Sequence, residues 1–231
     1  MQISPADQAA IVDLALTSRR SVRGFLDTPV TREVVEEILR VAVRAPSGTN
    51  IQPWKIYVIH GQKRDELVKA VLHAHNTEPQ NHQTEYDYYP KTWRDPYLSR
   101  RRKIGWDMYG LLGISKGDKA KMHAQHGDNY SFFGAPVGMM FTVDSDMEYG
   151  SWLDSGMMIQ NVMTAARGRG LDTCPQQSWS TYHRIVKPIV GIPETETLMC
   201  GLALGYEDRN APINKLVTVR EPLENNTIFH W

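Results

Sequence analysis

Apolar side chains at helical spacing dominate the first part of the chain. Ser4 and the proline after it form a typical helix start, because serine caps a helix and proline fits its first turn. An apolar stripe then continues to about Arg19. A second stripe keeps the i, i+3, i+4 spacing from Thr31 to Ala42 and stops before Pro46, since a residue that precedes proline is disfavoured in the helical conformation. The pattern predicts two helices, the first of which ends in an arginine-rich exit.

Runs of β-branched and aromatic residues alternate with further helical stripes in the rest of the chain. The run at 137–143 is apolar without alternation, as expected for a strand buried on both faces, and Ser151 with Asp154 forms a cap-like start for a long helix. No repeat or low-complexity linker interrupts the pattern, so a single α+β domain is expected over residues 1–231, with a mixed sheet flanked by helices. The predicted strands are 54–59, 137–143, 171–174 and 197–206, and the further predicted helices are 62–75, 151–168 and 181–190.

Two segments show neither the helical spacing of apolar residues nor the pattern of a strand. Between Tyr86 and Tyr109, within the irregular stretch 77–130, aromatic side chains alternate with arginines and a lysine. Such alternation can bind single-stranded nucleic acid, but it also suits a surface packed against a partner subunit, and the sequence contains no nucleic-acid module. The final segment, 211–231, has few apolar residues and no periodicity. It is expected either to be disordered or to lie against another surface.

Composition and charge exclude several classes of protein. The chain has 231 residues, and its 26 basic residues equal its 26 acidic ones, so no overall field favours nucleic acid or a membrane surface as partner. No stretch reaches the roughly 18 apolar residues of a membrane span, and the N-terminus lacks the pattern of a signal peptide. Cys174 and Cys200 are too few for a disulfide framework. We therefore expect a reduced, cytoplasmic protein with neither a membrane nor a nucleic-acid partner.

Three arginines and a serine within five residues form the first candidate site. Cations at the end of a helix complement its dipole, which is one explanation for Arg19 and Arg20. With Ser21 and Arg23 beside them, the same group can hold a phosphate through charge-assisted, partly bidentate hydrogen bonds. The second candidate is the polar loop 46–54, whose hydroxyl and amide groups suit the rim of a heteroaromatic ring or a sugar-like chain.

The two segments carry a specific pattern. Arg-Arg-Ser-Val-Arg at 19–23 and Pro-Ser-x-x-Asn-x-Gln-Pro-Trp at 46–54 resemble the flavin-binding signature of the nitroreductase family, which are FMN-dependent NAD(P)H oxidoreductases. The stretches 134–136 and 174–178 and the closing Arg220 continue the resemblance over nearly the whole chain. The resemblance implies a three-layer sandwich, in which helices flank a mixed, mainly antiparallel sheet, and an intertwined homodimer.

The resemblance also assigns roles to the two irregular segments. Residues 77–130 would be a lid that covers the flavin and shapes the substrate pocket, and residues 211–231 an arm that embraces the second subunit. The arginines at 94 and 100–102 could receive the 2′-phosphate of NADPH or could form a solvated face. The predicted substrate-binding residues are Tyr88, Tyr89 and Trp93.

The predicted cofactor is FMN, with NAD(P)H as reductant. By resemblance, the arginine segment and Arg220 would hold the phosphate and ribityl chain, the loop that begins at Pro46 would come from the other subunit, and the backbone N–H groups of Gln177 and Ser178 would face flavin N5. Arg23 could instead reach the pyrimidine edge. Many family members carry Glu-Gly in place of Gln177 and Ser178. The predicted cofactor-binding residues are Arg19, Arg20, Ser21, Arg23, Pro46, Ser47, Asn50, Gln52, Pro175, Gln176, Gln177, Ser178 and Arg220.

The predicted reaction is the reduction of nitroaromatic compounds, such as nitrobenzoates or dinitroanilines, to nitroso or hydroxylamine products. The resemblance implies a ping-pong hydride transfer through flavin N5, in which no side chain is an obligatory acid or nucleophile. A reductive dehalogenase and a general flavin reductase are alternatives on the same scaffold, and a non-catalytic flavin-binding dimer is an alternative of another class. The aromatic lid favours the nitroaromatic substrate.

Neither a metal site nor a nucleophilic cysteine is expected. His73 and His75 lie two residues apart on a predicted helix and so face different sides. Cys174 has no histidine partner nearby in the sequence, which favours a packed thiol over a nucleophile.

Overall fold

The central sheet is antiparallel, and its strands β1, β2 and β4 are rich in β-branched, aromatic or other apolar residues. A computed structural model describes residues 3–231; the first two residues of the expected domain lie outside this range. The strands are β1 (Trp54–His60), β2 (Val137–Asp144), β3 (Asp172–Gln176) and β4 (Glu196–Gly205), in the order β1-β2-β4-β3. All three pairs of neighbouring strands are antiparallel, and the parallel element is an isolated bridge between Ser21 and Thr173.

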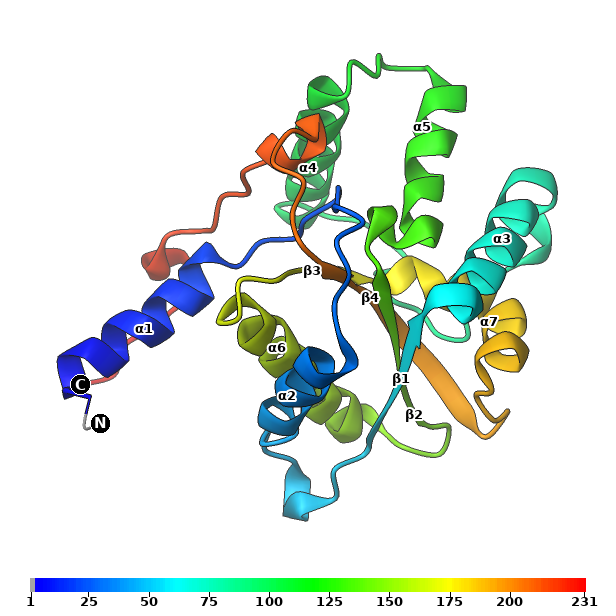
Figure 1. Cartoon of the computed structure of the whole chain (residues 1–231). Helices are drawn as coiled ribbons and strands as arrows, with labels where there is room; N and C mark the ends of the chain where they lie inside the picture. Colours follow the sequence, from blue (N-terminus) through cyan, green and yellow to red (C-terminus); the bar gives the residue numbers. More distant parts are fainter. Residues whose placement is uncertain (1–2) are drawn as a thin grey trace.

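Residues 3–231 form seven helices and several short 3-10 turns, and all of the helices except α1 lie around this sheet (Figure 1). The helices are α1 (Pro5–Ser18), α2 (Arg32–Ala42), α3 (Gly61–Thr77), α4 (Tyr97–Leu111), α5 (Lys119–Gly127), α6 (Tyr149–Arg167) and α7 (His183–Val190). The 3-10 turns are η1 (Gly48–Asn50), η2 (Pro79–Asn81), η3 (Asp128–Gly134), η4 (Gln177–Tyr182), η5 (Pro212–Lys215) and η6 (Leu223–Asn225). Among the described residues, no helix is long and apolar enough to cross a membrane.

Apolar cores lie on both faces of the sheet, which gives three layers. On one face, Ile38 of α2 and Val162 of α6 are fully buried against β2 and β4. On the other face, Leu67 of α3 and Val186 of α7 pack with aromatic side chains of η3 and η4. This arrangement explains why seven of the eight residues of β2 are buried, and it confirms the predicted α+β three-layer fold.

Two glycines allow aromatic rings to lie directly on the sheet. Phe132 and Trp179 stack with their ring centroids 4.4 Å apart. A Cβ atom on Gly138 would come within 2.3 Å of the Phe132 ring, and one on Gly201 within 2.3 Å of Trp179. Side chains at these two positions would therefore displace the rings that anchor η3 and η4.

The sequence pattern misplaced one helix start. The helix predicted from Ser151 begins two residues earlier, at Tyr149, with Glu148 as its N-cap. Ser151 lies inside the first turn, where its hydroxyl contacts the sulfur of Met147. Asp154, which had been assigned to the cap, instead accepts a hydrogen bond from the distant N–H of Gly48. A serine followed by an acid gives the same local sequence signal whether the serine caps a helix or lies inside its first turn.

The lid and the C-terminal arm both have defined structure. The lid (residues 77–130) contains α4 and α5, which rise side by side from one end of the sheet in Figure 1. The arm (residues 211–231) contacts α4 through η5 and then runs back towards α1 (Figure 1). Helix α1 projects from the domain and buries none of its residues. Large apolar side chains of the arm, including Val217 and Ile228, are exposed in the single chain.

Candidate functional site

The arginine-rich segment lies along strand β3. Helix α1 ends at Ser18, and Arg19 takes an extended conformation. The N–H of Val22 then donates to the carbonyl oxygen of Thr173 at 3.1 Å, beside the bridge between Ser21 and Thr173. Because β3 includes Pro175 and Gln176 and is followed directly by Gln177 and Ser178, this pairing places the arginine segment beside the strand that carries the other predicted cofactor segment.

Arg20 is used to fix this segment in place. Its guanidinium forms an ion pair with Glu207 and donates to the carbonyl oxygen of Asn214. The Asn214 side chain also accepts from the N–H of Arg23 at 2.8 Å and donates to the carbonyl of Gly24 at 2.7 Å. The segment is thus tied to the chain that follows the last strand, and Arg20 already has two partners within the protein.

Arg19 and Arg23 remain available for a ligand. Neither forms an ion pair with a carboxylate among residues 3–231, and both are half-buried. Both lie near the Cys174 thiol, whose pKa burial raises to about 11, although the charges of Arg23 and Arg19 and a hydrogen bond with Ser21 oppose the shift. The thiol is therefore protonated at neutral pH, as a packed cysteine should be. A small cavity of about 70 Å³ lies beside Arg23, between α4 and α5.

The loop after β3 presents free donors beside this segment. Gln177 and Ser178 open the 3-10 turn η4, so their N–H groups have no acceptor within that turn. The hydroxyl oxygen of Ser178 is buried and has no hydrogen-bond partner among the described residues. Gln176 is held by its donation to the carbonyl of Asn129 at 2.6 Å, while the neighbouring Pro175 is exposed. Residues 175–178 are thus held in place through Gln176, while the Ser178 hydroxyl is left without a partner.

The loop 46–54 has a strained backbone. Thr49, Asn50 and Gln52 have φ angles of 49°, 62° and 50°, in the left-handed region that side chains other than glycine rarely adopt. Each such residue costs on the order of 1 kcal/mol. Hydrogen bonds hold the conformation, since the N–H of Gln52 donates to the Ser47 hydroxyl at 3.0 Å. Strain of this kind, maintained at an exposed corner, is typical of a binding loop.

This loop does not meet the arginine segment within one chain. In Figure 1 the η1 turn lies at the lower end of the molecule, beyond α2, whereas the arginine segment lies beside β3. The exposed residues of the loop include Pro46, Asn50 and Gln52. One protomer therefore holds the two predicted halves of the cofactor site apart.

The predicted substrate residues form a row of rings at the start of the lid. Tyr88 and Tyr89 meet edge to face at 4.7 Å between centroids, and Tyr89 lies 5.2 Å from Trp93. Before them, the hydroxyl of Tyr86 donates to the carbonyl of Met199 on β4. The Tyr86 ring packs edge to face on Trp152 of α6 at 4.6 Å. The row is therefore anchored to the sheet through Tyr86, which precedes it in the chain.

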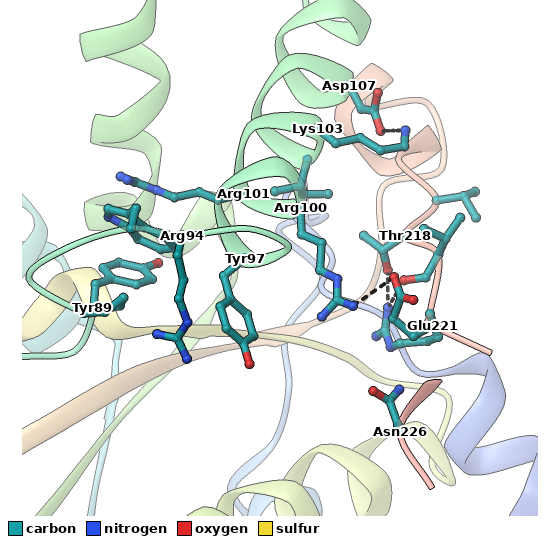
Figure 2. Close-up of a pocket in the computed structure, with 16 residues that line it drawn as sticks. Tyr89, Arg94, Tyr97, Arg100, Arg101, Lys103, Asp107, Thr218, Glu221 and Asn226 are labelled. Atoms are coloured by element: carbon teal, nitrogen blue, oxygen red, sulfur yellow. Dashed lines mark hydrogen bonds and ion pairs between the residues drawn. The ribbon is translucent and has the colours of Figure 1, made fainter. Parts of the chain in front are cut away.

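Figure 2 shows a cavity of about 900 Å³ between the start of α4 and the arm. It brings together Tyr89, Trp93 and Arg220, which the sequence had assigned to substrate and cofactor. Tyr88 does not line it. The Arg220 guanidinium donates only to Thr218 and to the Val219 carbonyl, so its charge is not neutralised by a carboxylate among residues 3–231.

Several residues important for the site escaped the sequence pattern. They are Glu207, which neutralises Arg20, and Glu85 and Lys187, which form a partly buried ion pair at the base of the lid. Each pairs with a residue far away in the sequence, so no local signal could have revealed it. His75 lies in the interior and contacts the Tyr182 hydroxyl and the His123 carbonyl. Within the described part of the chain, no group of three or more His, Cys, Asp or Glu residues could hold a metal ion.

Comparison with known proteins agrees with this fold. The model of the nitroreductase family matches residues 16–206, and the chain belongs to that family. A 4-nitrobenzoate reductase of Pseudomonas putida is 40% identical over 94% of this chain and 94% of its own length. A 4-nitrobenzoate reductase of Nocardioides sp. (strain LMS-CY) is 39% identical over 95% of this chain and 90% of its own length. The predicted family and enzyme class, an oxidoreductase, are confirmed.

Solved structures agree with the comparison of sequences. The FMN- and NADPH-dependent nitroreductase NfnB from Sphigopyxis sp. strain HMH superposes with a TM-score of 0.92 at 38% identity, covering 95% of this chain and 99% of its own. The FMN-dependent nitroreductase NfnB from Mycobacterium smegmatis, solved in complex with NADPH, has a TM-score of 0.92 at 28% identity, with 97% and 100% covered.

Proposed function

We propose that this protein is an FMN-dependent oxidoreductase that uses NAD(P)H to reduce nitroaromatic compounds. The observation that carries the proposal is the pairing of the arginine segment with β3. It brings the segment of Arg19 and Arg23, neither of which has a carboxylate partner among residues 3–231, alongside the strand that leads into Gln177 and Ser178. The relatives named above are reductases of nitrobenzoates or FMN-dependent nitroreductases, which supports the same cofactor and substrate class.

The residues present fit FMN. Arg19, Ser21 and Arg23 would hold the phosphate and ribityl chain, with Arg220 as a further cation from the arm. The orphaned hydroxyl of Ser178 and the N–H groups that open η4 are the donors that a heteroaromatic edge would satisfy. Arg20 would act indirectly, since its charge is already paired with Glu207.

When bound, FMN would supply the two-electron chemistry that connects NAD(P)H to the nitro group. The chain's own residues would bind and orient the substrates and would exclude water from the site. Tyr88, Tyr89 and Trp93 offer flat aromatic faces on which an electron-poor ring can stack. Two equivalents of NAD(P)H and two protons would convert one nitro group into a hydroxylamine and one water molecule, with protons drawn from solvent.

A homodimer would complete the site. The support is the apolar surface that one chain leaves uncovered: on α1, Ile11, Leu14 and Leu16 are 57%, 66% and 48% exposed. On the arm, Val217 and Ile228 are 81% and 83% exposed. Such a surface favours association. In this dimer the strained loop 46–54 of one chain would meet the arginine segment of the other. We retain the cytoplasm as the proposed compartment, because both cysteines are free thiols.

The test is an assay of the purified protein with NADPH and 4-nitrobenzoate, in which NADPH oxidation and products are measured together. We expect the hydroxylamine with a two-to-one ratio of NADPH to nitro compound. A halogenated benzoate without a nitro group tests the dehalogenase, and free FMN as acceptor tests the flavin reductase. Faster turnover with either of these than with the nitro compound would contradict the proposal. A protein that binds FMN but oxidises no NADPH would be a non-catalytic binder.

A further inference from the structure

The cavity between α4 and the arm carries a local excess of positive charge. Five basic and two acidic side chains line it, whereas the chain as a whole has a net charge of zero. The basic residues are Arg94, Arg100, Arg101, Lys103 and Arg220, and the acidic ones are Asp107 and Glu221. We call this cavity the basic groove. Its charge points to an anionic ligand.

Two of the five cations are already neutralised. Arg100 lies 3.0 Å from a carboxylate oxygen of Glu221, and the ammonium of Lys103 lies 2.6 Å from Asp107, as the dashed lines in Figure 2 mark. Neither Arg94 nor Arg101 has a carboxylate partner anywhere in residues 3–231. Together with Arg220, which also lacks a carboxylate partner there, these guanidinium groups are the ones that a ligand can engage without breaking an existing ion pair.

Two of the unpaired guanidiniums lie over aromatic rings of the groove. Arg101 lies 4.6 Å from the centroid of Trp93 and 5.4 Å from that of Tyr89, and Arg94 lies 5.1 Å from that of Tyr97. Stacking holds a guanidinium plane in place while leaving its N–H groups free at the edge. Tyr97 is 48% exposed and Tyr89 54%, so both rings present open surface. The groove thus combines fixed phosphate donors with flat surfaces for a heteroaromatic base.

We propose that the basic groove binds the adenosine end of NADPH, with Arg94 and Arg101 as its phosphate-binding cations and the ring of Tyr97 supporting the adenine. The inference rests on the proposed function, because Arg220, which lines the groove, is also the cation of the arm that is proposed to reach the flavin phosphate. A 2′-phosphate is the only group that distinguishes NADPH from NADH. Two free guanidiniums beside an open ring therefore make the enzyme selective for NADPH.

The direct test is a binding measurement that requires no turnover. The FMN-loaded protein is titrated calorimetrically with adenosine 2′,5′-bisphosphate and, separately, with adenosine 5′-phosphate. We expect the bisphosphate to bind roughly tenfold tighter or more, since a charge-assisted hydrogen bond typically contributes a factor of this size. Arg94→Gln and Arg101→Gln should each lower its affinity about tenfold. Arg102→Gln is the matched control, because Arg102 follows on the same helix but does not line the groove.

Steady-state kinetics provide the second readout. Both groove variants should raise KM for NADPH about tenfold and leave KM for NADH unchanged, and Arg101→Lys should recover part of the loss. Equal affinity of the wild type for the two adenosine ligands would overturn the inference. So would an equal rise of KM for NADPH and NADH, which would indicate a role in lid structure, or displacement of the bisphosphate by equimolar inorganic phosphate.

A third measurement separates this inference from the proposed function. The enzyme is reduced with light instead of NADPH and then mixed with 4-nitrobenzoate. Reoxidation of the flavin by the nitro compound in wild type and in both groove variants would support the proposed function even if the adenosine ligands failed to discriminate. If the photoreduced protein does not react, the proposed function fails, and with it the inference.

Discussion

The ammonium group of Lys187 lies 2.5 Å from the carboxylate of Glu85 and ties helix α7 to the base of the lid. Lys187 is only 2% exposed. The second oxygen of the same carboxylate accepts from the N–H of Leu198 on β4 at 3.1 Å. Both oxygens are therefore used, and the next residue, Tyr86, is bonded to β4 as well. The pair determines where the aromatic row of the lid begins.

Replacing Lys187 by methionine should destabilise the protein. It removes the ammonium partner of a carboxylate whose side chain is 19% exposed and which also lies 3.3 Å from His183, so the cost should be below the roughly 3–5 kcal/mol of a fully buried pair. The midpoint of urea unfolding should fall accordingly, and KM for the nitro compound should rise more than kcat falls, because the lid loses its anchor. The double variant Lys187→Met with Glu85→Gln should recover part of the loss, since it removes the unpaired charge. Equal stability of wild type and Lys187→Met would refute this role.

Protonation of His75 should make stability depend on pH. Its ring is 4% exposed, and burial lowers its pKa below the value of 6.5 for an unperturbed histidine. Below pH 6.5 the unfolded chain therefore binds a proton that the folded protein does not, so the free energy of unfolding falls as the pH drops from 6.5 towards the lower pKa of the folded state. The slope from one such group is at most about 1.4 kcal/mol per pH unit.

The His75→Gln variant measures this contribution. Urea unfolding between pH 8 and pH 5 should show a smaller loss of stability on acidification than wild type, whatever the variant's stability at pH 8. The matched control is His73→Gln, an exposed position on the same helix, which should keep the wild-type slope. Identical slopes in wild type and His75→Gln would rule out His75 as the titrating group.

The two neighbouring arginines should have different roles. Arg19→Gln should weaken FMN binding roughly 10- to 100-fold through loss of a charge-assisted hydrogen bond, with little effect on the stability of the apoprotein. Arg20→Gln breaks the ion pair with Glu207 and should lower stability by about 1–2 kcal/mol, since the Arg20 side chain is 36% exposed. Titration of the apoproteins with FMN, followed by flavin fluorescence, and urea unfolding separate the two effects. The reverse assignment would show that Arg20 is the phosphate ligand.

A mixed dimer should regain activity that each parent lacks. The proposed site combines Arg19 of one chain with Asn50 of the other, so a dimer of Arg19→Gln and Asn50→Ala chains has one doubly altered site and one intact site. Co-expression with two affinity tags should yield mixed dimers with about half the activity of wild type, because one of their two sites is intact. Activity no higher than that of the parents would mean that the two residues do not belong to sites shared between chains.

The sequence predicted elements best where burial follows a simple period. The strand at 137–143 was identifiable because apolar layers cover both faces of the sheet at this strand, and α2 because Val35, Ile38 and Ala42 form one buried face. Helices α4 and α5 were not predicted. No residue of α4 is buried, so it has no apolar face from which a helical period could be recognised.

The candidate site was predictable only in part, for a similar reason. Its first motif was recognisable as a local cluster of cations. Which arginine of the cluster is paired within the protein and which is free for a ligand depends on Glu207, which lies 187 residues from Arg20 in the sequence. Likewise, 102 residues separate Glu85 from Lys187. Folding brings such partners together, and neither partner carries a local signal of the other.

The absorption spectrum of the purified protein tests the central claim most directly. It should be recorded without oxygen, first alone, then after NADPH, and then after 4-nitrobenzoate. The account predicts a flavin spectrum that bleaches with NADPH and returns in full with the nitro compound. A colourless protein that does not take up added FMN would contradict the account at its base, and the arginine segment would then be a charged helix end without a cofactor.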